Sequence, residues 1–369
     1  MVQGAPAVPD ASEFQTLHEV VKAARANVPD GPWDYLVGAA ETETTVLRNR
    51  FAIDSLALRP RVLHDVRMID CTSKFLGQTM RLPVFVAPMG SVQMLDASAG
   101  LGLAKGAEQF GVTSFLSSTA SPGLEAVAAA CKGPKIFQLY VRGDLAWVED
   151  YVRRAIAGGF HAFCITVDTA LYGRRERDVI KRFVPIARRA MTGADFQASI
   201  SWDLVKWFKD KFQLPLILKG IATAEDAITA VEHGVEVIYV SNHGGRQLDQ
   251  GVGSLDVLPE VLDAVRGKAD VIVDGGFMRG TDVLKGIALG AKAVGLGRVC
   301  GFGLGAAGEA GVRRVLELME IEIRTAMGLL GVTRVDQINQ RHVRAAPPIR
   351  IPNTLKSAFP HLDLNEGRY

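Results

Sequence analysis

Short apolar runs alternate with amphipathic stretches along most of this chain. From residue 82 onward the apolar runs predict strands at 83–87, 112–116, 135–138, 162–166, 214–218, 235–240, 269–273 and 291–295. Helical periodicity lies between or after them, near 97–109, 123–131, 144–157, 201–211, 223–233, 255–266, 279–288 and 309–328. Uninterrupted apolar strands are expected where both faces of a sheet are covered. The pattern predicts an α/β fold, a (β/α)8 TIM barrel, since eight units of a doubly wound sheet would normally include a domain break.

A helical extension precedes the predicted barrel. The spacing of apolar residues from Phe14 to Ala24 predicts an amphipathic helix with Ser12 as its N-cap, and a second helical stretch runs from about Pro32 to Arg50. Residues 72–80 resemble a hairpin, and the Ala/Pro-rich residues 1–10 are expected to be disordered. We therefore expect one domain over 11–345, followed by a C-terminal tail at 346–369.

Composition narrows the possible functions. The 369 residues are 48% hydrophobic and 22% charged with a net charge of +2, which gives no bulk field for nucleic acid or an anionic membrane. Four scattered cysteines and isolated histidines show no metal-ligand spacing, so no metal is predicted. No apolar run of membrane-spanning length, signal peptide or peroxisomal C-terminus is present. We expect a cytoplasmic protein with no membrane or nucleic-acid partner.

Polar residues collect directly after six consecutive predicted strands, from the third to the eighth. They are Gln138 to Tyr140, Thr166 to Asp168, Lys219, Ser241 to Asp249, Asp274 to Gly276, and Gly295 to Arg298. In a barrel of this type the chemistry lies at the C-terminal ends of the strands. The same end of the predicted barrel is therefore the expected site.

The stretch Ser241-Asn242-His243-Gly244-Gly245-Arg246-Gln247-Leu248-Asp249 is the densest of these groups. The glycine pair lets the backbone turn sharply, so that His243 and Arg246 can converge. A histidine beside a permanent cation suits a substrate that has both a proton to remove and an anionic group. A polar loop that caps its own strand is the alternative interpretation.

Glycine-rich turns follow the last two predicted strands. Backbone N–H groups around Gly275, Gly276 and Gly297, together with Arg279 and Arg298, can surround a phosphate. Asp274 could accept hydrogen bonds from a ribityl or ribose hydroxyl.

Lys219 at the end of the fifth predicted strand has two interpretations. It could form a Schiff base, as in aldolases, or it could be a fixed cation beside an electron-rich cofactor ring. The Schiff-base interpretation leaves His243 and Arg246 without a role, so the second is favoured.

Residues 241–249 resemble the signature of the FMN-dependent L-2-hydroxy acid oxidases and dehydrogenases, which include glycolate oxidase, lactate oxidase, mandelate dehydrogenase and flavocytochrome b2. Further segments match that family in the same order: Phe137-Gln138-Leu139-Tyr140, Thr166-Val167-Asp168-Thr169, Gly173-Arg174-Arg175-Glu176, Leu218-Lys219-Gly220 and Asp274-Gly275-Gly276. The resemblance covers about residues 30 to 345. It implies oxidation of an L-2-hydroxy acid to the 2-oxo acid with FMN as cofactor, oxygen or another molecule as electron acceptor, and a homotetramer.

The resemblance also implies roles for individual residues. His243 is expected to be the base, Asp168 to orient it, and Tyr35 and Tyr140 to hydrogen-bond the substrate. Arg246, together with Arg175 or Arg174, is expected to hold the substrate carboxylate or position the loop. The residues expected to contact FMN are Pro88, Met89, Gly90, Ser117, Gln138, Thr166, Lys219, Ser241, Asp274, Gly276, Arg279, Gly297 and Arg298.

The chain departs from that family at three positions. Thr119 stands where relatives often have an aromatic residue, which predicts a wider substrate pocket for acids larger than glycolate or lactate. Gly90 replaces a frequent alanine, as in relatives that decarboxylate their product as monooxygenases. Met278 replaces an arginine of the phosphate turn, while Arg279 is kept.

The segment 183–199 is short for the family and lacks a long apolar insert, which disfavours its membrane-bound branch. The basic-hydrophobic piece Arg182–Met191 could cover the active site as a mobile lid or be a plain surface loop. Three functional alternatives stay open beside the simple oxidase or dehydrogenase: a lactate-monooxygenase-like decarboxylase, a Schiff-base aldolase or lyase, and a catalytically silent barrel that binds FMN or an anion.

Overall fold

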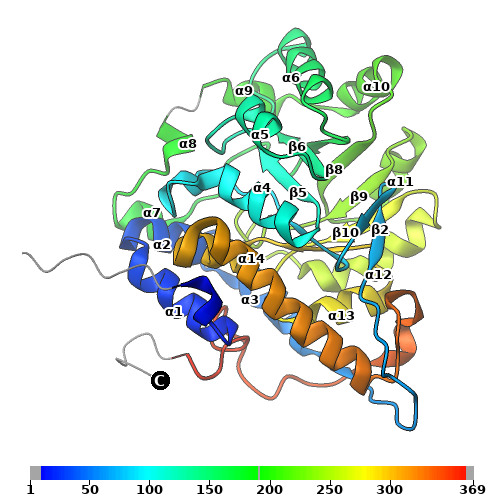
Figure 1. Cartoon of the computed structure of the whole chain (residues 1–369). Coiled ribbons are helices and arrows are strands. Elements are labelled where there is room, and N and C mark those ends of the chain that lie inside the picture. The colour runs from blue at the N-terminus through cyan, green and yellow to red at the C-terminus, as the bar shows by residue number, and fades with distance from the viewer. Residues whose placement is uncertain (1–9, 190–191, 363–369) are drawn as a thin grey trace, which may run out of the picture.

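The computed structural model describes residues 10–189 and 192–362, and its centre is a closed barrel of eight parallel strands (Figure 1). The strands follow one another around the barrel in chain order, and the last pairs with the first. They are β4 (Val84–Val86), β5 (Ser114–Ser117), β6 (Lys135–Leu139), β7 (Ala162–Thr166), β8 (Leu216–Ile221), β9 (Val237–Val240), β10 (Asp270–Val273) and β11 (Val294–Leu296). The predicted (β/α)8 barrel and all eight of its strands are confirmed, with small differences at their ends.

Aromatic side chains fill the interior of the barrel. Phe85, Phe115 and Tyr239 contact one another with ring centroids 4.9 to 5.8 Å apart. Gly295 makes room for them, because a Cβ atom there would lie 2.8 Å from both Phe85 and Tyr239. The packed interior leaves the polar residues that follow the strands gathered at one end.

Helices cover the outside of the barrel, as the periodicity predicts. They are α4 (Ala99–Phe110), α5 (Leu124–Ala130), α6 (Leu145–Ala157), α10 (Trp202–Lys211), α11 (Ala224–Glu232), α12 (Ser254–Val265), α13 (Gly280–Leu289) and α14 (Arg298–Leu329). The helix predicted at 309–328 starts earlier, and a break in helical geometry at Ala307 and Gly308 divides it. The glycine-rich first part has low intrinsic helix propensity, and its glycines allow close packing. A Cβ at Gly305 would lie 2.6 Å from Val28.

The first helix begins later than predicted. Residues 11–13 form the short 3₁₀ turn η1 (Ala11–Glu13), and α1 (Leu17–Asn27) starts after Thr16. Thr16 and Glu19 form a reciprocal capping box, which satisfies backbone N–H groups at the helix start better than Ser12 does. The prediction of Ser12 as N-cap is therefore wrong, while the amphipathic helix itself is confirmed and packs on α14.

The single helix expected from about Pro32 to Arg50 is two helices, α2 (Asp30–Val37) and α3 (Thr44–Asp54). The connection bonds to loops of the barrel instead of continuing the helix: Ala40 N–H donates to the Gly245 carbonyl at 2.9 Å, and Glu41 N–H to the Arg174 carbonyl at 2.7 Å. These long-range bonds replace helical ones, and they bring the end of α2 over the site.

Smaller elements complete the fold. The expected hairpin is confirmed as β2 (Ser73–Phe75) and β3 (Gln78–Met80), and β1 (Leu56–Leu58) pairs with β12 (Val343–Ala345). The 3₁₀ turns η2 (Val92–Met94), η3 (Val335–Gln337) and η4 (Gln340–His342) lie in connections. The segment 183–199 contains α8 (Ile186–Arg189) and α9 (Ala194–Ala198), and α7 (Glu176–Ile180) precedes it.

The two ends of the chain are described only in part. Residues 346–362 run back across α1, where Phe359 is fully buried and contacts His18. The expected disorder of residues 1–10 falls almost entirely outside the described residues, and the tail is described only to residue 362. Within the described residues, no helix has the length and hydrophobicity needed to span a membrane.

Candidate active site

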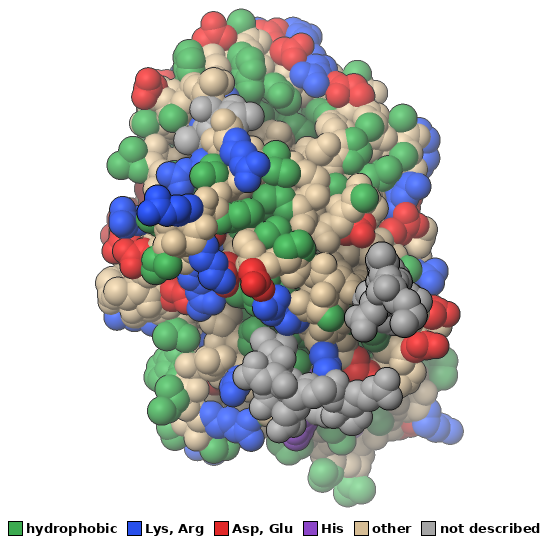
Figure 2. All heavy atoms as spheres, turned by 90° about the vertical axis from the view of Figure 1, so that its left-hand side faces the viewer, with side chains coloured by type: hydrophobic (Ala, Val, Ile, Leu, Met, Phe, Trp, Pro, Cys, Tyr) green, Lys and Arg blue, Asp and Glu red, His purple; other side chains and the backbone are tan. Residues whose placement is uncertain are grey.

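A cavity opens at the C-terminal end of the barrel, and a residue from or just after each of the eight strands lines it. Figure 2 shows the side of the molecule that carries α2, α7 and α8, where Lys and Arg side chains gather beside a strip of hydrophobic ones. The predicted site residues in the lining are Tyr35, Pro88, Met89, Gly90, Thr119, Tyr140, Arg175, Lys219, His243, Arg246, Asp274, Gly276, Gly297 and Arg298. The fold thus brings together residues that are up to 263 positions apart (298 − 35 = 263).

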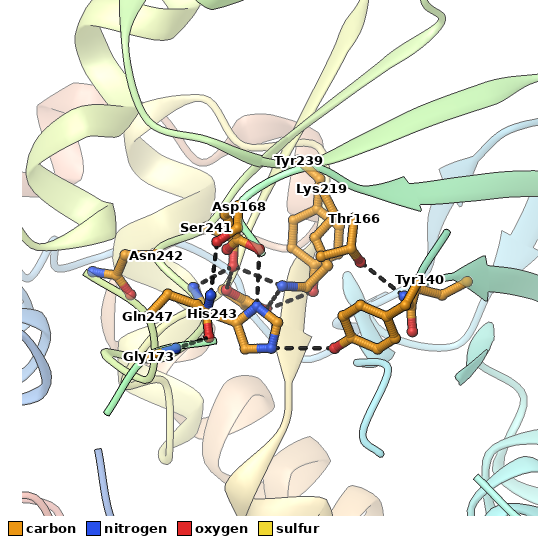
Figure 3. Close-up of polar contacts among 12 residues, drawn as sticks. Tyr140, Thr166, Asp168, Gly173, Lys219, Tyr239, Ser241, Asn242, His243 and Gln247 are labelled. Atoms are coloured by element: carbon orange, nitrogen blue, oxygen red, sulfur yellow. Dashed lines mark hydrogen bonds and ion pairs between the residues drawn. The ribbon is translucent and has the colours of Figure 1, made fainter. Parts of the chain in front are cut away.

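His243 is held at the centre of the site by contacts on both sides of its ring (Figure 3). Nδ1 lies 2.9 Å from an oxygen of Asp168, and Nε2 lies 3.2 Å from the hydroxyl of Tyr140. The backbone of His243 is in the left-handed region with φ of 58°, and its N–H donates to Ser241 Oγ at 3.1 Å. A non-glycine residue keeps such a conformation only when its surroundings enforce it, and such strain is concentrated at functional sites.

The pKa shifts of His243, Asp168 and Tyr140 favour one set of protonation states. Burial lowers the pKa of His243 below its usual value, although Asp168 opposes this shift. Burial acts to raise the pKa of Asp168, but the opposite charges of His243 and Lys219 outweigh it and lower that pKa. Burial raises the pKa of Tyr140, so its phenol stays protonated. Near neutral pH, Nδ1–H therefore donates to the Asp168 carboxylate, and Nε2 is an available base that accepts from Tyr140.

Two arginines lie beside the histidine, the buried Arg175 and the half-buried Arg246, and neither forms an ion pair with a described carboxylate. Arg246 donates from Nη1 to the backbone carbonyls of Tyr35 and Gly38 at 2.6 and 2.8 Å, and its guanidinium lies 4.6 Å from the centre of the Tyr35 ring. Its Nη2, like Nε of Arg175, is buried without a hydrogen-bond partner in the described part of the chain. Burial lowers the pKa of Arg246, and the nearby Arg175 adds to this effect. Unsatisfied buried donors of this kind indicate a binding site for an anion.

The same geometry separates Arg175 from its neighbour Arg174. Arg175 is 5% exposed, and its guanidinium lies 4.2 Å from the centre of the Tyr172 ring. Arg174 is exposed and forms an ion pair with Glu176 at 3.2 Å. Of the two arginines left open by the sequence, the structure brings Arg175 to the cavity.

The polar stretch 241–249 divides into residues that face the cavity and residues that build the loop. His243 and Arg246 line the cavity. Asp249 instead accepts hydrogen bonds from the N–H groups of Thr42 and Thr45 at the start of α3, which contributes to lowering its pKa to about 2. Gln247 donates to the carbonyls of Asp168 and Leu171 at 2.9 and 2.7 Å. Asp249 and Gln247 thus have structural roles, but they hold neighbouring segments and do not cap their own strand as the alternative interpretation expected.

A second polar network lies at the ends of β8, β9 and β10 (Figure 3). Lys219 Nζ donates to Ser241 Oγ at 3.0 Å and forms an ion pair with Asp274 at 4.0 Å. Ser241 Oγ and the hydroxyl of Tyr239 each donate to Asp274, at 2.6 and 2.8 Å. Because Lys219 is one half of a buried ion pair, its position suits a fixed cation better than a Schiff-base nucleophile.

The strand ends also fit the flavin cofactor that the resemblance implies. Gln138 is fully buried, and its Nε2 donates to Thr166 Oγ1 at 2.8 Å. Its Oε1 has no hydrogen-bond partner among the described residues. A buried acceptor of this kind requires a donor, and an N–H group of a flavin ring is one. Ser117 at the end of β5 and Ser241 directly after β9 are also expected to contact FMN.

The structure does not bring Arg279 to the cavity. Its guanidinium forms an ion pair with Glu322 of α14 at 2.6 Å and donates to the Ala358 carbonyl at 2.9 Å. Met278 lines the cavity in its place, while Arg298 lies in the glycine-rich part of the lining. Burial lowers the pKa of Arg298 to about 9. The phosphate contact expected of Arg279 therefore has no support in this geometry, because the acid on α14 binds the side chain elsewhere.

Gly90 and Thr119 share one space in the wall of the cavity. A Cβ atom on Gly90 would overlap Thr119 Oγ1, which lies 3.0 Å from Ser117 Oγ. The hydroxyl of Tyr35 donates to the Gly90 carbonyl at 3.2 Å. The two departures seen in the sequence are therefore physically coupled.

The sequence analysis missed some lining residues, notably Arg142, Tyr172 and Arg188. Arg142 follows Tyr140 by two residues at the same strand end, a signal that could have been used. Tyr172 and Arg188 come from the long connection after β7, where strand-end position gives no guide.

Comparisons with known proteins agree with this geometry. The family model described as FMN-dependent dehydrogenase matches residues 24–345. The chain is 40% identical to a peroxisomal (S)-2-hydroxy-acid oxidase of Oryza sativa over 89% of this chain and 95% of the relative. It is 37% identical to an L-lactate oxidase of Nostoc sp. over 88% and 96% of the two chains. A crystal structure of mandelate oxidase with benzoyl-formic acid superposes with a TM-score of 0.84 at 38% identity, covering 91% of this chain and 100% of that one.

Proposed function

This chain belongs to the FMN-dependent dehydrogenase family and is an FMN enzyme that oxidises 2-hydroxy acids, and from that premise we propose that His243 is its catalytic base. The observation that carries the proposal is the placement of the His243 ring. Asp168 holds Nδ1 at 2.9 Å, which leaves Nε2 in the cavity, 3.2 Å from the Tyr140 hydroxyl. A base with a lowered pKa is neutral at pH 7 and can accept a proton.

The reaction removes two electrons and two protons from an L-2-hydroxy acid and yields the 2-oxo acid. FMN, when bound, would accept the electron pair and the other proton. His243 takes one proton from the substrate, and the Asp168 carboxylate stabilises the imidazolium that results. This role is the same whether the proton comes from the hydroxyl or from the α-carbon.

Arg246 and Arg175 bind the substrate carboxylate in this proposal. Arg246 has a free Nη2 and Arg175 a free Nε, and neither has an acidic partner in the described chain. A planar guanidinium binds a carboxylate through two hydrogen bonds, which fixes the orientation of the acid. Tyr35 and Tyr140 hydrogen-bond the substrate, and Thr119 in the wall leaves space for acids larger than glycolate or lactate.

Two outcomes of the oxidation are distinguished by the residue at position 90. The simple outcome releases the 2-oxo acid and transfers the electrons to oxygen, as the names of the oxidase relatives suggest, or to another acceptor. The second outcome is oxidative decarboxylation of the retained product. The absence of a Cβ at Gly90 is the observation that favours it. A cytoplasmic location and a homotetramer stay predictions, and the rice relative is named as peroxisomal.

The visible spectrum of the purified protein tests the proposal. Flavin bands should bleach when L-lactate, L-mandelate or a longer L-2-hydroxy acid is added without air, and readmitted air shows whether oxygen restores them. Product analysis then separates a 2-oxo acid from a shortened acid with CO2. His243→Ala should still bind FMN but bleach about 10²- to 10⁴-fold more slowly. A colourless protein that cannot be loaded with FMN, or full turnover by His243→Ala, would contradict the assignment.

A further inference from the structure

The cavity holds more arginines than the proposed reaction uses. Arg246 and Arg175 are assigned to one carboxylate, and Arg298 lies in the glycine-rich part of the lining. Two further arginines, Arg142 and Arg188, line the same cavity. Their chemistry has no role in the oxidation of a simple monocarboxylic acid.

Arg142 is half-buried at the end of β6, two residues after Tyr140. Burial lowers the pKa of its guanidinium, and the phenol of Tyr140 opposes that shift. No carboxylate in residues 10–189 and 192–362 lies within ion-pair distance of it. The preceding residue is fixed, because Val141 N–H donates to Gln197 Oε1 at 2.7 Å. The guanidinium is therefore a partly desolvated cation on a well-anchored segment.

Arg188 lines the same cavity from α8. Its guanidinium lies 4.6 Å from the centre of the Tyr172 ring, and Arg175 lies 4.2 Å from the same ring. Arg188 is exposed and has no ion pair with any described residue. It adds positive charge at the cavity without being neutralised.

Nearby arginines that do not line the cavity behave differently. Arg177 forms an ion pair with Glu43 at 2.6 Å, and Arg174 pairs with Glu176. These paired arginines contrast with those of the lining named above, which form no ion pair with any described residue. The selective lack of acidic partners at the lining indicates that the partner of these arginines is a ligand.

The carboxylates near the cavity do not neutralise the positive charge of its arginines. Burial raises the pKa of Asp178, and Arg246, Arg175 and Arg188 counteract that shift. One carboxylate thus faces three arginines and forms no ion pair with any of them. Asp195 of α9 lines the cavity but is exposed, and it too is unpaired in the described chain.

We propose that the substrate carries a second anionic group, so that the enzyme oxidises a 2-hydroxy dicarboxylic acid whose distal carboxylate is bound by Arg142 with help from Arg188. The inference rests on the proposed function, in which Arg246 and Arg175 bind the carboxylate next to the reacting carbon. Thr119, in the wall of the same cavity, has a hydroxyl in place of an aromatic ring. The distal group distinguishes this substrate class from glycolate, lactate and mandelate.

Matched pairs of acids test the proposal on the FMN-loaded enzyme. L-Malate is compared with L-2-hydroxybutyrate, and L-2-hydroxyglutarate with L-2-hydroxyvalerate, so that each pair differs mainly in the distal carboxylate. Anaerobic bleaching of the flavin should give a kcat/KM for one of the dicarboxylic acids at least about 30-fold above its partner. This preference should weaken at high salt, because the distal contact is electrostatic and only partly buried.

Substitution at Arg142 then assigns the effect. Arg142→Gln should lower kcat/KM for the dicarboxylic acid about 30- to 100-fold, mainly through KM, while Arg142→Lys should recover part of it. The monocarboxylic acid of the pair is the internal control, since it offers no group for Arg142. Arg154→Gln is the control variant, because Arg154 lies on the outer helix α6 and pairs with Glu125 and Asp150.

The possible outcomes are distinct. Equal or faster bleaching by both monocarboxylic acids would overturn the inference and leave the proposed oxidation intact. An equal loss for both members of a pair in Arg142→Gln would show a structural role only, and would also overturn it. If no 2-hydroxy acid of either kind bleaches the bound flavin, the proposed function itself has failed.

Discussion

Arg50 is buried and Arg246 is half-buried, and the protein treats their charges in opposite ways. Arg50 on α3 donates to both oxygens of Asp282 at 2.8 and 3.0 Å and to Asp54 at 2.9 Å. Burial acts to lower its pKa, but the two carboxylates outweigh this effect and raise it. Among the described residues, Arg246 donates only to backbone carbonyls and keeps one buried nitrogen without a partner, and its pKa is lowered.

The difference separates a charge that stabilises the fold from a charge that is available to bind a ligand. Taking a guanidinium out of water costs several kcal/mol wherever it is done. At the junction of α3 and α13 the chain itself supplies the compensating carboxylates, so the site is complete. At the mouth of the barrel the compensation is missing, and a ligand must supply it.

The largest expected effect is a loss of stability when the ion pair between Arg50 and Asp282 is broken. Arg50→Met leaves the carboxylate of Asp282 buried without a cation, so the free energy of unfolding should fall by about 3–5 kcal/mol. Urea denaturation followed by circular dichroism measures this change. Arg154→Met, which breaks only exposed ion pairs, is the matched control and should cost at most about 1 kcal/mol. A loss at Arg50 no larger than at Arg154 would show that the pair is not structural.

The same substitution at Arg246, which forms no ion pair with a described residue, should lower activity and leave stability almost unchanged. Arg246→Met removes the cation proposed to bind the substrate carboxylate, and kcat/KM should fall by the equivalent of about 2–5 kcal/mol. The free energy of unfolding should change by about 1 kcal/mol or less, because no buried carboxylate loses its partner. Steady-state kinetics and urea denaturation of the same preparation check both parts. A stability loss equal to that of Arg50→Met would remove the contrast between the two sites.

The pair of His243 and Asp168 lies between these extremes, since one side of the ring is paired and the other faces the cavity. Because burial lowers the pKa of His243, kcat/KM should rise with pH through a midpoint below 6.5 and then level off. Asp168→Asn removes the charge that raises this pKa, so the midpoint should move further down while the plateau falls about 10²-fold. Asp263→Asn, at an exposed position of α12, is the control. A midpoint that rises in Asp168→Asn would contradict the assigned interaction.

The smallest expected effect is at an uncharged part of the cavity wall, where Gly90 lies against Thr119. Gly90→Ala places a methyl group against Thr119 Oγ1 and should destabilise the protein by about 1 kcal/mol. Thr119→Ala in the same chain should recover most of that loss, with a coupling energy of about 0.5–1 kcal/mol in the double-mutant cycle. Independent, additive effects would show that the two residues do not share this space.

Much of the fold could be predicted from the pattern of apolar residues. The eight strands are buried on both faces, so their sequences are continuous apolar runs that need no knowledge of distant partners. The two errors near the N-terminus have local and long-range causes. Thr16 forms a better cap than Ser12, and the break after α2 depends on hydrogen bonds to loops more than 130 residues away (174 − 41 = 133).

The sequence by itself determined the barrel, the strand-end position of the site and the presence of His243 and Arg246 within it. These follow from local pattern, because chain order in a parallel barrel already decides which ends meet. Only the tertiary structure decided that Asp249 supports α3, that Glu322 binds Arg279 away from the cavity, and that Arg142 forms no ion pair with a described residue. Whether a charged side chain is paired depends on residues far along the chain, and its function depends on that pairing.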